Sequence, residues 1–241
     1  MGGEGYAGGA EGYAAVTANK GIGMKGLFIT LEGPEGSGKS TQIRLLAQRL
    51  QAVGHEVVLT REPGGTPAGE VIRHLLQHNA AGENLCAAAE TLLFSASRAQ
   101  LVHEVIVPAL ERGAAVLCDR FADSTTAYQG YGRGFDPEEL THLHRFALGD
   151  HWPDVTLLLD VPTEVGLARI HARADHAEEG LDRMEREAQA FHVRVAQGFR
   201  LLAARYPERF RTVDASGPPE DVHAAIVAIL APWIPVLEGA R

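Results

Sequence analysis

The stretch GPEGSGKST (Gly33 to Thr41) lies between the apolar run LFITLE and the helix-like TQIRLLAQRL. Its first eight residues satisfy the pattern G-x-x-x-x-G-K-[ST], and a strand before it and a helix after it are the context that this pattern requires. Glycines let successive backbone N–H groups face an anion, and the following helix adds its positive end. We therefore predict a loop that binds the phosphates of ATP, formed by Gly33, Pro34, Glu35, Gly36, Ser37, Gly38, Lys39, Ser40 and Thr41.

Two side chains of this loop have specific predicted roles. Lys39 is expected to reach the β- and γ-phosphates, and Ser40 is expected to ligate magnesium. The loop by itself indicates only a nucleoside triphosphate, because switches, partition ATPases and small-molecule kinases all use it.

Short apolar runs alternate with longer helical patterns from residue 25 onward. The runs are apolar on both faces, which is typical of strands buried in a parallel sheet. They span 27–32, 56–60, 114–119, 154–161 and 209–215, and the helical patterns span 40–53, 67–78, 86–112, 137–148, 184–206 and 219–231. This order predicts a three-layer α/β/α fold around a five-stranded parallel sheet, with its ligands beyond the carboxyl ends of the strands.

The composition is that of a folded globular protein. Hydrophobic residues make up 45% of the 241 residues and charged residues 22%, and we expect residues 25–241 to form one domain. The net charge of −9 argues against non-specific binding to nucleic acid. Two distant cysteines fit a reducing cytoplasm, and no run of roughly 18 apolar residues is present to span a membrane. Residues 1–24 are rich in Gly and Ala and lack the features of a signal peptide, so we expect a flexible extension.

Two segments place polar side chains directly after predicted strands. REPGGT begins with Arg61 at the ligand edge of the sheet, although an arginine there can also form a surface ion pair. CDRFADSTTAYQGYGRG follows the third strand as a loop. It presents Asp119, Arg120, Ser124, Tyr128 and Gln129.

A third segment, ETLLFSASRAQL, has a helical pattern. It places Phe94 and Arg98 four residues apart, on one face of the helix. A ring beside a guanidinium can stack on a flat base and bond its edge or a phosphate. Taken alone, Phe94 is equally compatible with a place in the core.

The ordered segments EGPEGSGKST, REPGGT, FSASRAQ, DRFADSTTAYQGYGRG and LDR resemble the motif set of bacterial thymidylate kinases over about residues 27–231. The resemblance implies the nucleoside monophosphate kinase fold and a homodimer. It also implies in-line phosphoryl transfer from MgATP to dTMP, which makes dTDP on the way to dTTP. Such transfer depends on alignment and charge neutralisation, with a mobile lid that excludes water.

The resemblance also implies roles for the acceptor site. Phe94 stacks on thymine, Arg98 contacts the carbonyl edge of the base, and Gln129 helps to read it. Arg61 and Arg120 hold the phosphate of dTMP.

Further roles that the resemblance implies concern the sugar and the metal. Glu35 approaches the 3′-hydroxyl, and Tyr128 packs near the sugar, where its ring disfavours a 2′-hydroxyl. Asp119 lies near magnesium and the acceptor, and Ser124 belongs to the same site.

The segment 167–187 follows the fourth predicted strand, where the resembling kinases have their lid. Arg169, Arg173 and Arg183 are the candidates to close on the transferring phosphoryl group, and Arg183 is also expected to contact ATP. Some relatives carry this arginine within the phosphate loop, where this chain has Gly36, so a lid arginine is expected to replace it. A long acidic connection, DHAEEG, leaves the choice between Arg169 and Arg173 open, with Arg173 preferred.

Two alternative functions remain: a kinase for another nucleoside monophosphate, and a nucleotide-dependent switch or partition module. The same fold also serves kinases for other nucleoside monophosphates, although the pyrimidine-type contacts argue against them. A nucleotide-dependent switch needs an N-K-x-D segment after a strand, whereas the one Asn-Lys pair of this chain, Asn19-Lys20, precedes the phosphate loop. A partition ATPase carries a second lysine near the start of that loop, where this chain has Pro34 and Glu35.

Overall fold

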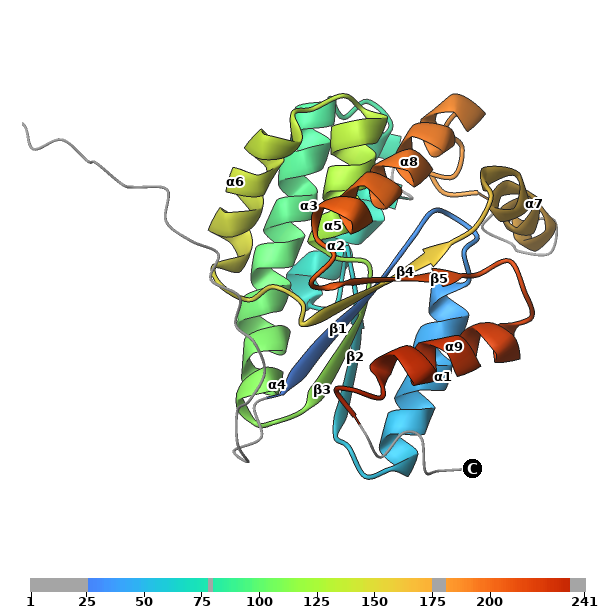
Figure 1. Ribbon diagram of the computed structural model, residues 1–241. Coiled ribbons are helices and arrows are strands. Elements are labelled where there is room, and N and C mark those ends of the chain that lie inside the picture. Colours follow the sequence, from blue (N-terminus) through green and yellow to red (C-terminus); the bar gives the residue numbers. More distant parts are fainter. Residues whose placement is uncertain (1–25, 78–79, 175–180, 235–241) are drawn as a thin grey trace, which may run out of the picture.

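The computed structural model describes residues 26–77, 80–174 and 181–234, so the predicted extension at 1–24 lies outside the described residues. Five parallel strands form one sheet in the order β2-β3-β1-β4-β5 (Figure 1). The strands are β1 (Leu27–Glu32), β2 (Val57–Arg61), β3 (Ala115–Asp119), β4 (Val155–Asp160) and β5 (Phe210–Asp214). The five predicted strands are confirmed, with ends that differ by at most one residue.

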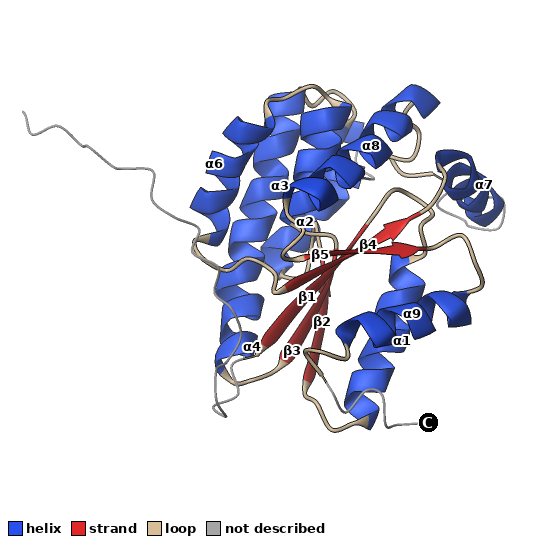
Figure 2. Ribbon diagram, viewed as in Figure 1, coloured by secondary structure: helices blue, strands red, loops and turns tan. Residues whose placement is uncertain are grey.

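Helices cover both faces of the sheet, as the sequence predicts (Figure 2). α1 (Lys39–Ala52) and α9 (Pro219–Leu230) lie on one face. The other face carries α3 (Ala87–Leu101), α4 (Val107–Glu111), α6 (Pro137–Leu148) and α8 (Gln189–Arg205). The remaining helical elements are α2 (Pro67–Gln77), η1 (Ala80–Gly82), η2 (Val102–Ile106), α5 (Ala122–Thr125), η3 (Thr126–Gly132) and α7 (Thr163–Ala174).

The central strand β1 shows why its segment is apolar throughout. Successive side chains of a strand point to opposite faces, so Phe28 packs in the cluster beneath α3 and α4 while Ile29 packs beneath α1 and α9. Both side chains are fully buried. Burial of this kind stabilises a fold by about 25 cal/mol per Å² of apolar surface, which makes the sheet the rigid base of the molecule.

Three predicted elements differ from the structure. The predicted helix at 86–112 is divided by the π-helical turn η2, and the predicted loop at 118–134 is helical from Ala122 to Gly132 through α5 and η3. The predicted helix at 184–206 begins only at Gln189. Its expected first turn is instead part of a turn in which Asp182 N donates to Glu185 Oε2 and Glu185 N donates to Asp182 Oδ1.

The parallel order brings the carboxyl ends of all five strands to one edge of the sheet. The phosphate loop follows β1, the Arg61 segment follows β2, and α5 begins just after β3. Within the described residues, no helix has both the length and the apolar character needed to cross a membrane.

Candidate active site

The phosphate loop depends on glycines at positions that other residues adopt only with strain. Gly33, Gly36 and Gly38 have φ angles of 143°, 70° and 90°. A Cβ on Gly33 would lie 2.4 Å from the carbonyl oxygen of Leu159, and one on Gly36 would lie 2.2 Å from that of Gly166 in α7. The loop is therefore packed against both β4 and the start of the lid segment.

Lys39 lies at the centre of this loop. Its Nζ donates to the carbonyl oxygens of Gly33 (3.0 Å) and Pro34 (2.8 Å) and to Ser37 Oγ (3.1 Å). Burial and the nearby Arg120 lower the pKa of Lys39 to about 8 against the opposing charges of neighbouring carboxylates. The ammonium is thus mostly protonated at neutral pH, as a phosphate-binding group must be.

Ser40 and Asp119 form an oxygen pair at the end of the loop. Ser40 Oγ donates to Asp119 Oδ2 at 2.9 Å, and these are hard ligands that suit magnesium. Across the described residues, no group of three or more His, Cys, Asp or Glu side chains could hold a metal. A pair of ligands fits magnesium, because that ion keeps several waters and binds substrate phosphates. Thr41 is exposed in the next turn, and its N–H donates to the Gly38 carbonyl.

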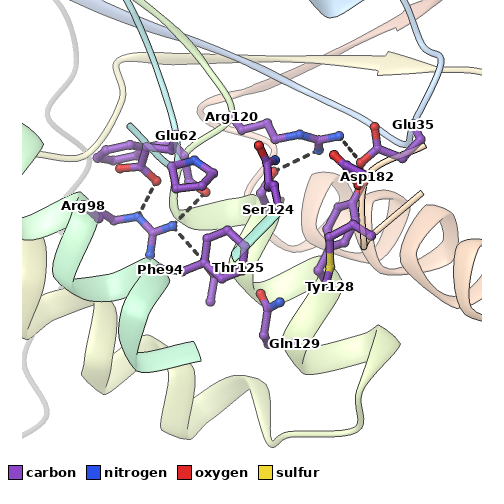
Figure 3. A pocket seen from close by; sticks show the side chains of 14 residues that line it. Glu35, Glu62, Phe94, Arg98, Arg120, Ser124, Thr125, Tyr128, Gln129 and Asp182 are labelled. Carbon is purple, nitrogen blue, oxygen red and sulfur yellow. Dashed lines mark hydrogen bonds and ion pairs between the residues drawn. The ribbon is translucent and has the colours of Figure 1, made fainter. Parts of the chain in front are cut away.

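A pocket of about 420 Å³, part of it open to solvent, adjoins the loop (Figure 3). It extends from the phosphate-loop residue Glu35 to side chains of α3, α5 and η3. The residues that line it are Glu35, Glu62, Pro63, Gln77, Phe94, Arg98, Arg120, Phe121, Ser124, Thr125, Tyr128, Gln129, Asp182 and Met184. Predicted site residues from three separate sequence segments are thus brought together.

Arg120 joins the loop to the pocket. Its Nη1 donates to the Gly33 carbonyl at 3.2 Å and to Ser124 Oγ at 3.3 Å, while its Nη2 donates to Glu35 at 2.6 Å. The guanidinium also lies over the ring of Tyr128, 5.0 Å from its centroid. Arg120 has a φ of 68°, the one non-glycine residue with a positive φ in the described part of the chain. Strain of this kind is often found at functional sites.

Glu35 is held as an anion at the mouth of the pocket. Its Oε1 accepts from Arg120 and from the Tyr128 hydroxyl, the latter at 2.8 Å. Burial alone would raise the pKa of Glu35, but Arg120, Lys39 and the hydroxyl outweigh it and lower the pKa to about 2. Glu35 therefore presents a fixed negative charge and an acceptor.

The far end of the pocket combines a ring with two polar groups. Phe94 and Arg98 both line it, as their spacing on the helix predicts, and Gln129 points into the cavity from η3 (Figure 3). Arg98 is 1% exposed. Its Nε donates a hydrogen bond to Glu62 Oε2 at 2.8 Å, and its Nη2 donates to Thr125 Oγ1 at 2.8 Å. Its Nη1 is buried without a hydrogen-bond partner among the described residues, so it is a donor that a ligand can satisfy.

Glu32, which the sequence analysis did not identify, fixes the start of α5. Its Oε1 accepts from the backbone N–H groups of Phe121 (2.7 Å) and Ser124 (3.2 Å), and its Oε2 lies 2.6 Å from Ser124 Oγ. Because Ser124 in turn contacts Arg120, the carboxyl group of Glu32 supports the residue that joins loop and pocket.

Arg61 lies outside the pocket lining, where it forms an ion pair with Glu70 at 2.9 Å, and 53% of its side chain is exposed. Arg73 of α2, a residue that the sequence analysis missed, donates to the carbonyl oxygen of Pro63 at the pocket wall. Burial and the charge of Arg61 lower the pKa of Arg73, and Arg120 adds to this effect. Arg61, Arg73 and Arg120 are thus close enough for their charges to interact, although Arg61 is also paired with Glu70.

The three lid arginines lie in different places. Arg169 lies behind the phosphate loop and donates to the carbonyl oxygens of Gly36 (3.3 Å), Ala215 (3.0 Å) and Ser216 (3.2 Å). Arg173 pairs with Glu185 and is 60% exposed.

Arg183 packs against α2 and α3. It donates to the Leu76 carbonyl at 2.9 Å and to Glu90 at 2.5 Å. Its neighbours Asp182 and Met184 line the pocket. These contacts place Arg183 beside the pocket, and its predicted contact with ATP stays a prediction.

Comparisons with known proteins agree on one family. A model of the thymidylate kinase family matches residues 31–226. The thymidylate kinase of Thermomicrobium roseum is 55% identical over 201 residues, which cover 83% of this chain and 92% of the relative. The thymidylate kinase of Pseudomonas fluorescens Pf-5 is 51% identical over 218 residues, which cover 90% of this chain and 100% of the relative. The crystal structure of thymidylate kinase from Ehrlichia chaffeensis matches with a TM-score of 0.68 and 36% identity, over 85% of this chain and 98% of that one.

Proposed function

Because this chain belongs to the thymidylate kinase family, which phosphorylates dTMP to dTDP with ATP, we propose that the pocket binds dTMP and that the phosphate loop binds ATP. The fold is that of the P-loop nucleoside monophosphate kinases. The observation that carries the proposal is Arg120, whose guanidinium contacts the phosphate loop, Glu35 and the pocket at once. An arginine in that place can neutralise charge between a donor and an acceptor phosphate.

The acceptor lies with its base at the far end of the pocket and its phosphate near the loop. Phe94 stacks on thymine, while Arg98 Nη1 and Gln129 contact the edge of the base. Arg120, with Arg61 and Arg73, holds the phosphate. Glu35 and Tyr128 face the sugar, Glu35 as acceptor for the 3′-hydroxyl and Tyr128 as a steric barrier to a 2′-hydroxyl, and Ser124 positions Arg120.

The donor side requires mainly positive charge and alignment. Lys39 binds the β- and γ-phosphates of ATP, and Ser40 and Asp119 hold magnesium, which supplies charge neutralisation when bound. The phosphate of dTMP is largely dianionic near neutral pH, so an acceptor oxygen attacks the γ-phosphorus and ADP leaves without a strong general base.

The lid arginines have different proposed tasks. Arg169 supports the back of the phosphate loop through the Gly36 carbonyl, and Arg173 reaches the transferring phosphoryl group. Arg173 is suited to this role because it is exposed and is close enough to Glu35 to interact with its charge. The lid comprises about residues 167–187 of one kinase domain at 25–241.

We further propose that the protein is a cytoplasmic homodimer. Three large apolar side chains are exposed on the adjacent helices α2, α3 and α6: Val71 (71% exposed), Leu92 (58%) and Phe146 (89%). A second copy of the chain that covers this apolar patch would remove it from water.

The test is ADP release by purified protein with MgATP and a panel of dTMP, dUMP, UMP, CMP, AMP and GMP, with a control without acceptor. We expect dTMP to give the highest kcat/KM and the control to be silent. Lys39→Ala is expected to abolish transfer with every acceptor while its melting temperature stays near that of the wild type, because it removes the central cation of the loop.

Each contrary result identifies a different error. Turnover by Lys39→Ala contradicts the donor site, and ADP release without acceptor contradicts the assignment of Arg61, Phe94 and Arg98. A preference for another monophosphate leaves the mechanism in place and contradicts only the base pocket.

A further inference from the structure

A buried carboxylate lies directly behind the base-reading end of the pocket. Glu90 of α3 is 1% exposed and accepts from Gln129 Nε2 at 2.8 Å, from Arg133 Nε at 3.0 Å and from Arg183 Nη2 at 2.5 Å. Glu90 is not part of the pocket lining, whereas Gln129 is. Of the three side chains that donate to Glu90, Gln129 is the one that lines the pocket, so the most direct route from Glu90 to a bound base is through Gln129.

We propose that Glu90 is a specificity-determining residue, because it fixes which end of the Gln129 amide faces the base and so selects 4-oxopyrimidines against 4-aminopyrimidines. The inference rests on the proposed function, since it requires Gln129 to read the base. It explains why Gln129 presents the oxygen of its amide, rather than the nitrogen, to the base.

The orientation follows from the charge of Glu90. Burial on its own would raise the pKa of Glu90, but hydrogen bonds from Arg133, Gln129 and Arg183 outweigh it and lower the pKa. An ionised carboxylate only accepts hydrogen bonds, so the neighbouring amide must present its Nε2. The amide oxygen, Gln129 Oε1, is then turned away from Glu90 and is available to a ligand.

The available groups complement one type of pyrimidine edge. Gln129 Oε1 is an acceptor, and the unpartnered Arg98 Nη1 is a donor. Thymine and uracil present an N3–H donor beside a 4-oxo acceptor, which matches both groups. Cytosine presents an N3 acceptor beside a 4-amino donor, so acceptor meets acceptor and donor meets donor. A reversed Gln129 amide would remove half of this discrimination.

The test compares kcat/KM for dTMP and dCMP in full-length variants, with dCMP also measured as an inhibitor of the dTMP reaction. Glu90→Gln has an amide that can donate to Gln129 Oε1 and so permits the reversed orientation. We expect the dTMP-to-dCMP ratio to fall about tenfold or more. Glu90→Asp keeps the charge but withdraws the oxygens from Gln129. It is the test variant to use if Glu90→Gln does not fold.

Two controls separate orientation from general damage. Arg183→Gln removes another partner of Glu90 without freeing Gln129, and we expect it to lower kcat/KM for both acceptors with an unchanged ratio. Gln129→Leu removes the reading group itself and is expected to lower the ratio most. If Gln129→Leu lowers the ratio and the folded Glu90 variants do not, the role of Glu90 is refuted. If Gln129→Leu also leaves it unchanged, the proposed reading of the base is wrong as well.

Discussion

Phe94 is the residue whose removal best isolates the acceptor base. Because its ring lines the pocket and lies outside the phosphate loop, Phe94→Ala is expected to raise the KM for dTMP about tenfold to a hundredfold, the usual worth of one base stacked on an aromatic ring. The KM for ATP is expected to stay the same. Steady-state kinetics with each substrate varied in turn measures both constants.

Gln100→Ala is the control for Phe94, since it changes the same helix but removes only a surface contact with Glu104. Both constants are expected to be unaffected by it. An unchanged KM for dTMP in Phe94→Ala would place that ring outside the acceptor site.

Glu32 gives a prediction about pH. Burial, and then the charge of Asp123, raise the pKa of Glu32 to about 8, against an ordinary value of 4.5. A raised pKa means that its contribution to stability is fully present below about pH 4.5 and is lost as pH rises through about 8. The free energy of unfolding of the wild type should therefore fall relative to Glu32→Gln by about 1.4 kcal/mol per pH unit across this window.

Denaturant unfolding of both proteins at several pH values measures this difference. Glu32→Gln is a suitable reference because its amide can accept from Phe121 N and donate to Ser124 Oγ, in place of the protonated carboxyl. The titrating groups that do not interact with Glu32 are shared by the two proteins and cancel in the difference. Parallel pH curves for the two proteins would show that Glu32 is ionised in the fold.

Site residues differed in how far sequence could predict them. Phe94 and Arg98 were predictable because helical spacing alone puts them on one face, and both line the pocket. Glu32 and Glu90 were missed because each acts on another side chain across the fold, 92 residues away for Glu32 and Ser124 and 39 for Glu90 and Gln129. Arg73 lies on α2, one turn after Glu70, and it was missed because its contact with the Pro63 carbonyl oxygen depends on how α2 folds back on the preceding loop.

At the scale of elements, the contact between α7 and the phosphate loop can be tested by whether Gly166→Ala stabilises or destabilises the protein. Gly166→Ala would stabilise an ordinary helix by about 1 kcal/mol. Here the added Cβ would lie 2.4 Å from the carbonyl oxygen of Glu35, so we expect destabilisation by about 1–3 kcal/mol and a higher KM for ATP. Thermal unfolding and kinetics test this.

His171→Ala is the control for Gly166→Ala, because it raises helix propensity at an exposed position of the same helix. Its unfolding temperature should equal or exceed that of the wild type. A gain of stability in Gly166→Ala would mean that α7 does not press on the loop.

Strands were easier to predict than the helical elements around the site. Burial on both sides of the sheet leaves an apolar run that is legible in the sequence, as in β1 and β4. The sequence predicts a loop where the structure has α5 and η3. Polar residues of this segment point toward the pocket or bond to Glu32, so the segment lacks the apolar periodicity of an ordinary helix. The sequence predicts a helix from residue 184, whereas α8 begins at Gln189. The ion pair between Arg186 and Glu83 joins the preceding residues to a distant segment, and such a tertiary contact leaves no local pattern in the sequence.

At the scale of the whole molecule, the exposed apolar patch predicts how the chain associates. Phe146→Glu places a charge at the most exposed large apolar residue of α6, and a buried charge at an interface is costly. We expect the protein to change from dimer to monomer, as measured by light scattering after size-exclusion chromatography at several concentrations.

Val193→Glu is the matched control, since Val193 is a half-exposed apolar residue on α8, outside the patch. It should leave the mass unchanged. Equal masses for wild type and Phe146→Glu would exclude this patch as the interface. The sequence predicts a dimer only through its resemblance to a family, because the apolar pattern of one chain does not distinguish a surface covered by a partner from a partly exposed core face.

The close approach of Gly36 to Gly166 also bears on how such kinases can diverge. An arginine at position 36 would meet the α7 backbone at a Cβ distance of 2.2 Å and would have to adopt a φ of 70°. If a lid arginine contacts the transferring group as proposed, a single substitution that puts an arginine at position 36 would disrupt the phosphate loop. In a chain with this geometry, α7 would have to shift before the loop could accept a side chain at position 36.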